Sequence, residues 1–270
     1  MRSTDFYLVK RSNFSNQTYD INLMPFLMIS FMLIHLDAVS QDTFSIVAVD
    51  TITGEVGSAG ASCLEIDHSR YQRTDFISQL IPGKGAINTQ AYYHPVNQMT
   101  ATTRLINGDS PEEVVSWMQE NDIANRADLR QYGVVAIIDG RPEAAAYTGS
   151  NTNNYHGQII GRNYAIQGNI LSGSEVLESM ETHFLNQPGS LSCKLMAALQ
   201  GAKSIGADTR CFANGSSSLF AFLSVSLPND SFGYPSISFS VNTKFGERIE
   251  PIDSLQHLFD LQYTCPSANH

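Results

Sequence analysis

After its first forty residues, the sequence has no long hydrophobic run and little positive charge. Its 270 residues include 16 Lys and Arg against 26 Asp and Glu, which gives a formal net charge of −10. An acidic chain without a basic run repels polyphosphates, so nucleic acid is not an expected partner. No segment after residue 40 is apolar enough to cross a bilayer, so no contact with a membrane is expected for this part of the chain.

Familiar catalytic and metal-binding motifs are missing as well. The sequence contains no GxSxG, no P-loop, no HExxH, and no GxGxxG leading from a strand into a helix. None of its four cysteines is part of a CxxC motif, so a zinc site is not expected. We therefore expect neither a bound metal nor a cofactor.

The first forty residues are typical of an export signal. Basic residues come first, and an apolar run extends from Leu23 to Leu36. Ala38 and Ser40 then place small side chains at the two positions that signal peptidase inspects. This pattern predicts a signal peptide over residues 1–40, a single domain over residues 41–270, and a secreted or periplasmic protein. An uncleaved anchor is the alternative.

All four cysteines (Cys63, Cys193, Cys211 and Cys265) follow the predicted signal. In an oxidising compartment they allow three pairings, among which the sequence does not choose. Cys193 and Cys211 would flank a helix end and its loop, so a bridge between them is the first expectation. Four unpaired, mostly buried thiols are the alternative.

Pairs of strands alternate with helices along the rest of the chain. Strand pairs are predicted within residues 43–62, 76–91, 130–149 and 217–242, with a further strand at 162–169. Helices are predicted at 95–107, after Ser110, and at 173–186, 190–204 and 250–262. Strand pairs separated by helices favour antiparallel sheets covered by helices, which is an α+β domain.

Thr43 opens the first predicted strand, two residues after the expected cleavage site. An N-terminal threonine can hydrolyse amides because its own α-amine, with a pKa near 8, acts as general base for its hydroxyl. That chemistry requires the threonine to be the first residue of the mature chain and to begin a buried strand.

Several segments resemble a known family in order and spacing. They are TFSIVAVD, TGEVGSAGAS, GAINTQA, LRQYGVVAIID, AAAYTG, YAIQGNIL, LMAALQGAKSIGADTR and PIDSLQHLF, and together they resemble the DUF1028 family over residues 43–260. That family is described as N-terminal-nucleophile (Ntn) hydrolases. The resemblance implies a four-layer αββα sandwich of two antiparallel sheets. It also implies an amidohydrolase that cleaves an amide bond in a small or peptide-like substrate.

The resemblance also suggests roles for individual residues. Thr43 is the expected nucleophile, Asn169 an oxyanion donor, and Asp208 a group that orients the Thr43 amine. The resemblance implies that Thr89, Gln90 and Arg210 bind substrate, the last as a clamp for a carboxylate. Independently of the resemblance, His94 lies in a predicted loop and is also expected to contact the substrate.

Each role has a plainer alternative. Thr43 can simply start an edge strand, and Thr89 and Gln90 can be hydrogen-bonded strand residues. Asn169 can be a turn residue, and Asp208 and Arg210 can pair with each other to hold a loop.

The whole protein has an alternative as well. It would be a non-catalytic module that binds a cell-wall or polysaccharide component, with Tyr92, Tyr93 and His94 stacking on the ligand. Gln41 and Asp42 precede Thr43, so cleavage after Ser40 would leave the Thr43 nitrogen in a peptide bond. Homo-oligomerisation is left open by the sequence.

Overall fold

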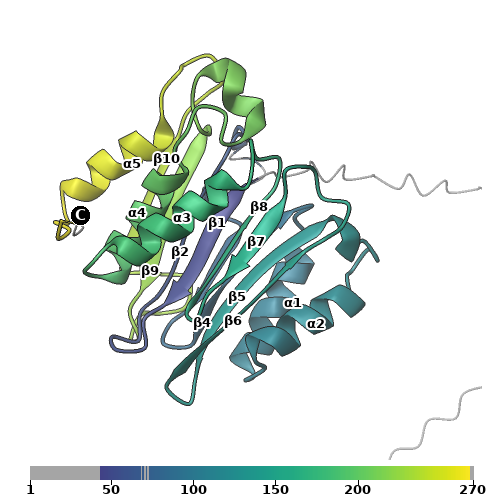
Figure 1. The fold of residues 1–270 in the computed structure, drawn as a ribbon. Helices are drawn as coiled ribbons and strands as arrows, with labels where there is room; N and C mark the ends of the chain where they lie inside the picture. The colour runs from purple at the N-terminus through teal and green to yellow at the C-terminus, as the bar shows by residue number, and fades with distance from the viewer. Residues whose placement is uncertain (1–42, 68, 70, 72, 268–270) are drawn as a thin grey trace, which may run out of the picture. The chain divides into compact units, whose positions relative to one another are not determined.

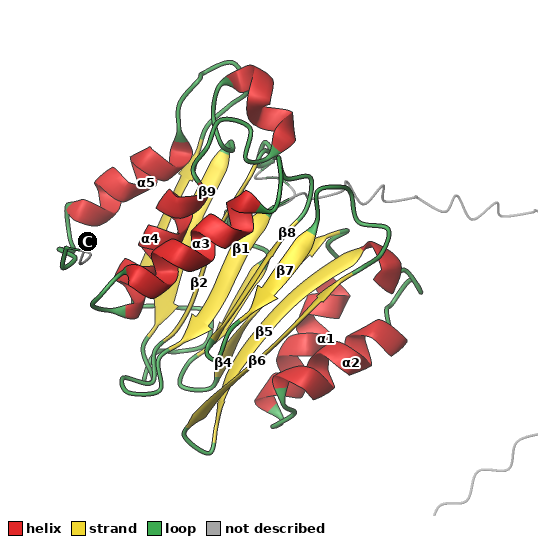
Figure 2. Ribbon diagram, viewed as in Figure 1, coloured by secondary structure: helices red, strands yellow, loops and turns green. Residues whose placement is uncertain are grey.

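The computed structural model describes residues 43–67, 69, 71 and 73–267. The predicted signal peptide and its cleavage site lie outside the described residues. Two antiparallel sheets and the helices that cover them make up the described chain (Figures 1 and 2). None of the helices in this part of the chain is long and apolar enough to span a bilayer.

The larger sheet has six strands in the order β10-β9-β2-β1-β8-β7, and each neighbouring pair is antiparallel. Its strands are β1 (Phe44–Val49), β2 (Val56–Ser62), β7 (Gly157–Ile160), β8 (Tyr164–Gly168), β9 (Phe220–Ser226) and β10 (Ile237–Asn242). Strand β1 is buried along its whole length, which explains why it is almost continuously apolar.

The smaller sheet has four strands in the order β3-β4-β5-β6, again antiparallel. Its strands are β3 (Ser78–Ile81), β4 (Gly85–Ala91), β5 (Arg130–Ile138) and β6 (Arg141–Thr148). Asp139 and Gly140 connect β5 to β6 with positive φ angles of 50° and 74°, as a tight two-residue hairpin turn requires.

The helices lie on the outer faces of the two sheets (Figure 2). The smaller sheet is covered by α1 (Pro95–Ile106) and α2 (Pro111–Glu120). The larger sheet is covered by α3 (Glu175–Asn186), α4 (Leu191–Ala202) and α5 (Pro251–Asp260). A third apolar cluster, which includes Val47 of β1 and Val135 of β5, lies between the sheets. The layers therefore run helix, sheet, sheet, helix, which confirms the α+β class.

Small residues in β2 let α4 pack closely on the larger sheet. A Cβ at Gly57 would lie 2.6 Å from Cδ1 of Leu195 in α4, too close without a shift. Ala59 and Ala61 of the same strand belong to the same helix-facing core. This explains why a fully buried strand reads VGSAGAS rather than a run of large apolar residues.

The secondary structure departs from the sequence prediction in a few places. Strand β7 forms in a stretch that was predicted to be a loop, where four residues pair with β8 at the sheet edge. A 3₁₀ helix, η2 (Thr209–Asn214), replaces part of a predicted loop, and a shorter one, η1 (Ala127–Leu129), precedes β5. Four residues are too few for a periodicity to be recognised in the sequence.

The cysteines form two disulfides, Cys63–Cys211 and Cys193–Cys265. The expected Cys193–Cys211 bridge is wrong, and so is the alternative of four free thiols. Cys63 directly follows β2, where η2 crosses and brings Cys211 to it. Cys193 lies in the first turn of α4, beside the segment that follows α5. The pairing depends on this tertiary arrangement, which spacing along the chain does not reveal.

We predict that non-reducing peptide mapping will recover the Cys63–Cys211 and Cys193–Cys265 peptides. The two bridges close sequence separations of 148 and 72 residues. Loop-closure entropy sets an upper estimate of about 4 to 5 kcal/mol of stability for each. Reduction should therefore lower the melting temperature strongly. Recovery of a Cys193–Cys211 peptide from folded protein would contradict the structure.

Candidate functional site

Thr43 lies at the start of an interior strand. Strand β1 is flanked by β2 and β8, so the alternative that Thr43 opens an edge strand is wrong. Side chains alternate along β1, with Phe44 and Ile46 facing the helices and Val47 facing the other sheet. Thr43 lies four residues before Val47, so its side chain is on the same face of the strand and points toward the four-stranded sheet. It is only 1% exposed.

Asn169 holds the backbone of Thr43 from the end of β8. The Thr43 N–H donates to Asn169 Oδ1 at 3.0 Å, and the Asn169 N–H donates to the Thr43 carbonyl at 3.2 Å. Asn169 is fully buried. Its side-chain oxygen thus contacts the Thr43 nitrogen, a role that the sequence analysis gave to Asp208. The structure does bring Asn169 and Thr43 together as predicted.

Gln90 reaches Thr43 from the opposite sheet. Its Nε2 donates to the Thr43 carbonyl at 2.9 Å and to Gln131 Oε1 at 2.8 Å, while Ser45 Oγ donates to its Oε1 at 2.6 Å. Gln90 is 1% exposed and lies on β4. It was predicted to bind substrate, but its contacts make it the hydrogen-bonded link between the two sheets beneath Thr43.

Two further glutamines complete this buried layer and were missed by the sequence analysis. Gln167 Nε2 donates to Ser45 Oγ at 2.6 Å, and Gln131 Nε2 donates to the Gly168 carbonyl at 2.8 Å. Gly133 makes room for them, because a Cβ there would lie 2.1 Å from Gln167 Oε1. The available signal was a long amide one residue from the end of a buried strand, as in RQYGVVAII and YAIQG.

Thr89 faces the other way and does not join this group. It neighbours Gln90 on β4, so its side chain lies on the opposite face, with that of Ile87 toward α1 and α2. Its hydroxyl is buried, and no other described residue hydrogen-bonds to it. The structure therefore separates Thr89 from the other predicted substrate-binding residues.

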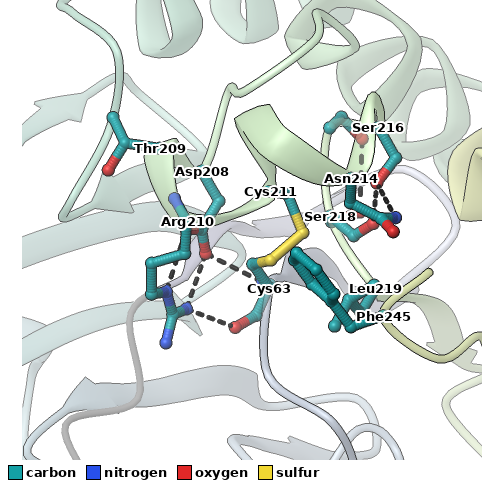
Figure 3. The surroundings of a disulfide bond; sticks show 12 residues. Cys63, Asp208, Thr209, Arg210, Cys211, Asn214, Ser216, Ser218, Leu219 and Phe245 are labelled. Carbon is teal, nitrogen blue, oxygen red and sulfur yellow. Dashed lines mark hydrogen bonds and ion pairs between the residues drawn. A yellow bond between two sulfur atoms is a disulfide. The ribbon is translucent and has the colours of Figure 1, made fainter. Parts of the chain in front are cut away.

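Asp208 and Arg210 hold each other beside the Cys63–Cys211 disulfide (Figure 3). Asp208 Oδ2 accepts from the Cys63 N–H at 2.8 Å and from Arg210 Nη2 at 2.6 Å, and Oδ1 accepts from Arg210 Nε at 3.0 Å. The carboxylate is fully buried and also caps η2. Asp208 thus fastens the loop to the end of β2, as the plainer alternative anticipated.

Arg210 nevertheless lies near Thr43. Its Nη2 also contacts Ser62 Oγ at 3.3 Å. Because Phe44 pairs with Ala61 across β1 and β2, Ser62 lies at the level of Thr43. The Arg210 side chain is 30% exposed. A cationic group is therefore held beside the start of β1, on the side opposite Asn169.

His94 has a structural task at the start of α1. Its Nδ1 accepts from the Val96 N–H at 3.2 Å and so caps the helix. Partial burial lowers the pKa of His94, and the nearby Arg130 lowers it further, against a smaller opposing effect of Asp122. The imidazole is therefore neutral at neutral pH, as its role as a hydrogen-bond acceptor requires.

The aromatic residues before His94 differ in what they contact. Tyr93 is half-buried and packs edge-on against Phe76, with ring centroids 5.3 Å apart. Tyr92 lies under Arg130, whose guanidinium is 4.9 Å from the ring centroid. Arg130 in turn pairs with buried Asp122 at 2.7 Å. Burial alone would raise the pKa of Asp122, but hydrogen bonds led by that from Arg130 lower it well below its usual range.

A cavity of about 210 Å³ adjoins this group. It is lined by Ala91, Tyr92, Leu129, Asn151, Thr152, Asn153 and Asn169. Ala91, which lines the cavity, has a positive φ angle of 64°, and so does the β-branched Ile170, at 53°, which follows the lining residue Asn169. Each directly follows a residue that binds Thr43, namely Gln90 or Asn169. Backbone strain of this kind persists only where the surroundings impose it, and it is common at functional sites.

Metal-ligating side chains do not converge in the described part of the chain. No group of three or more His, Cys, Asp or Glu side chains there is arranged to hold an ion. The polar groups around Thr43 are amides, hydroxyls and the Arg210 guanidinium, which is paired with the buried Asp208 carboxylate.

The fold and this group define a class of protein: an α+β sandwich of two antiparallel sheets with a buried polar group where its first strand begins. The chain belongs to the family described as "Family of unknown function (DUF1028)", whose model matches residues 43–233. The crystal structure of protein SPO2555 from Silicibacter pomeroyi, also assigned to DUF1028, is similar with a TM-score of 0.64. That similarity covers 83% of this chain and 90% of the other at 23% identity. None of the curated proteins matches.

Two neighbouring substitutions on β4 test the buried layer. Gln90→Leu removes the donor to Thr43 and the acceptor for Ser45, and buried polar groups left unpaired cost about 1 to 3 kcal/mol each. We expect a loss of about 2 to 4 kcal/mol in the free energy of unfolding, measured in urea. Thr89→Val, on the other face, should be neutral or slightly stabilising. Equal effects of the two substitutions would show that Gln90 does not link the sheets.

Proposed function

We propose that this protein is an exported amidohydrolase of the Ntn type, with Thr43 as its nucleophile. The observation that carries the proposal is the hydrogen bond from the Thr43 nitrogen to Asn169 Oδ1 at 3.0 Å, at the start of an interior strand. The layered order of helix, sheet, sheet and helix is the one expected of an Ntn hydrolase. Thr43 also has the buried, sheet-facing position that this chemistry requires.

The proposed reaction needs a free α-amine at Thr43. That amine, with a pKa near 8, takes the proton of the Thr43 hydroxyl as Oγ1 attacks the substrate carbonyl. The proton passes to the leaving nitrogen, the amide C–N bond breaks, and an ester to Thr43 remains. Water activated by the same amine then hydrolyses that ester and regenerates the threonine.

The surrounding residues have definite roles in this reaction. Asn169 Oδ1 accepts from the amine and so holds it in place. Gln90 fixes the carbonyl of Thr43, so both ends of the residue are positioned from neighbouring strands. Arg210 supplies positive charge beside Thr43 for a substrate carboxylate, in a protein whose net charge is −10.

Activation requires a cut between Asp42 and Thr43. Signal peptidase acting after Ser40 would leave Gln41 and Asp42 in place, and a nitrogen in a peptide bond is not a base. The proposal therefore includes a second cleavage that removes these two residues. Whether it occurs can be read directly from the mature N-terminus.

We predict that the active exported protein begins at Thr43, as N-terminal sequencing and intact mass would show. A chain expressed with an initiator methionine directly before Thr43 should become active once that methionine is removed. A matched chain that retains Gln41 and Asp42 should be inactive. Since the substrate is unidentified, the first readout is mass labelling of Thr43 by a β-lactone probe, which acylates activated hydroxyls.

The decisive variants are Thr43→Ala and Thr43→Ser. Thr43→Ala should abolish labelling and lower amidase turnover by at least about 10³-fold, because it removes the nucleophile. Thr43→Ser should keep part of both. Full activity in folded protein that still begins at Gln41 would rule out the mechanism.

A second candidate function is a binding module for a cell-wall or polysaccharide component. The cavity beside Asn169 favours it, because its polar side chains and Tyr92 suit a neutral ligand. Tyr93 and His94 do not support it, since packing and helix capping account for them. Ligand binding without turnover, in a chain that begins at Thr43, would favour this reading.

A further inference from the structure

We infer that the cavity beside Asn169 recognises an uncharged carboxamide group of the substrate and rejects the corresponding carboxylate. The inference takes the position of the reacting bond from the proposed function. Recognition of the carboxamide, however, is measured by binding and does not require turnover. Asn169 both lines the cavity and holds the Thr43 nitrogen. A group seated in the cavity would therefore lie next to the bond that Thr43 attacks.

The cavity has no charged side chain in its lining. Its polar groups are the side chains of Tyr92, Thr152 and three asparagines, of which Asn151 and Asn153 come from one loop. A carboxylate entering such a site would lose its hydration without gaining a cation. A neutral amide has a smaller desolvation cost and can both donate and accept hydrogen bonds.

The orientation of Asn151 favours a donor on the ligand. Asn151 Nδ2 donates to Asp128 Oδ2 at 2.8 Å, which leaves its carbonyl oxygen as the free end of the amide. The hydrogen bond from Asn151 is the main reason why the pKa of Asp128 is lowered, so Asp128 is ionised at neutral pH. A carboxamide N–H can donate to Asn151 Oδ1, whereas a carboxylate has no hydrogen to donate. Asp128 is also paired with Arg126 at 3.1 Å, so the discrimination rests on this hydrogen bond and not on repulsion by Asp128.

Asn153 supplies the complementary group. Its side-chain amide hydrogen-bonds to no other residue in the part of the chain that the structure describes, while its carbonyl accepts from the Ile170 N–H at 3.1 Å. The backbone is thus fixed and the amide is available to a ligand. A primary carboxamide would match both asparagines, donating to one and accepting from the other.

The cavity is of suitable size, and hydrogen bonds to backbone carbonyls hold the loop that carries Asn151 and Thr152. The cavity volume of about 210 Å³ is ample for a single carboxamide group. The Asn151 N–H donates to the Asp128 carbonyl at 2.8 Å, and the Thr152 hydroxyl donates to the Gly149 carbonyl at 2.8 Å. Little ordering should therefore be needed on binding.

The test compares two probes of equal shape, N-acetyl-L-glutamine and N-acetyl-L-glutamate, by calorimetric titration at neutral pH. Both carry the same α-carboxylate, so any contribution of Arg210 cancels. The protein is the Thr43→Ala variant, which cannot turn over either probe. We expect the glutamine derivative to bind at least about tenfold more tightly, because the glutamate derivative lacks the hydrogen bond to Asn151 Oδ1 and brings a second negative charge to a cavity whose lining has no cation.

Variants of the lining separate recognition from fold. Asn151→Leu should reduce the preference to within about twofold, whereas Asn153→Ala, which removes a donor that the oxygen of either probe can use, should weaken both probes and leave the preference in place. Asn229→Leu, in an exposed turn between β9 and β10, should leave it unchanged. Equal or tighter binding of the glutamate derivative would overturn the inference, and so would failure of both probes to bind at about 10 mM. Because catalysis is not read out, neither result depends on whether Thr43 becomes the mature N-terminus.

Discussion

The hydrogen bonds of Gln90 are the interaction on which the arrangement at the start of β1 depends. A buried amide must satisfy its donors and its acceptor, and Gln90 does so with Thr43 and Gln131 on one end and Ser45 on the other. These partners come from both sheets. An apolar residue at this position could fill the space but could not fix how one sheet is positioned against the other. Because several partners constrain the Gln90 amide, a small displacement of it would leave more than one buried group unpaired.

This layer also explains why Thr43 has a defined position in the folded chain. Asn169 holds its nitrogen and Gln90 holds its carbonyl, so neighbouring strands constrain the residue on both sides. The residues with strained backbone, Ala91 and Ile170, come directly after Gln90 and Asn169 in the chain. The Ile170 N–H donates to the Asn153 carbonyl, and the Ile170 carbonyl accepts from the Thr209 N–H. The strain, the cavity and the threonine therefore belong to one connected arrangement.

The sequence predicted the strands and helices well where burial is continuous, as in β1 and β5, because such runs leave few alternatives. It also identified Thr43, Gln90 and Asn169, which the structure brings together. It assigned the wrong partner to the Thr43 nitrogen, because Asp208 and Asn169 are equally plausible until the loop with Arg210 is placed. The disulfides and the role of Gln131 depend on which segments meet across the two sheets. Thr89 was grouped with Gln90 only because it is adjacent, although strand geometry puts adjacent residues on opposite faces.

The character of the groups around Thr43 bears on how it could react. The side chains bound to its backbone, those of Asn169 and Gln90, are neutral amides, which hold a proton donor or acceptor in place but do not take up a proton. Both oxygens of Asp208, the buried carboxylate nearby, are engaged by Arg210, and removing a charge from such a pair would leave the other uncompensated. In the proposed reaction, a base for the Thr43 hydroxyl must therefore come from elsewhere. A free α-amine at Thr43 would meet that need, and Asn169 Oδ1 would accept a hydrogen bond from it both before and after it gains a proton.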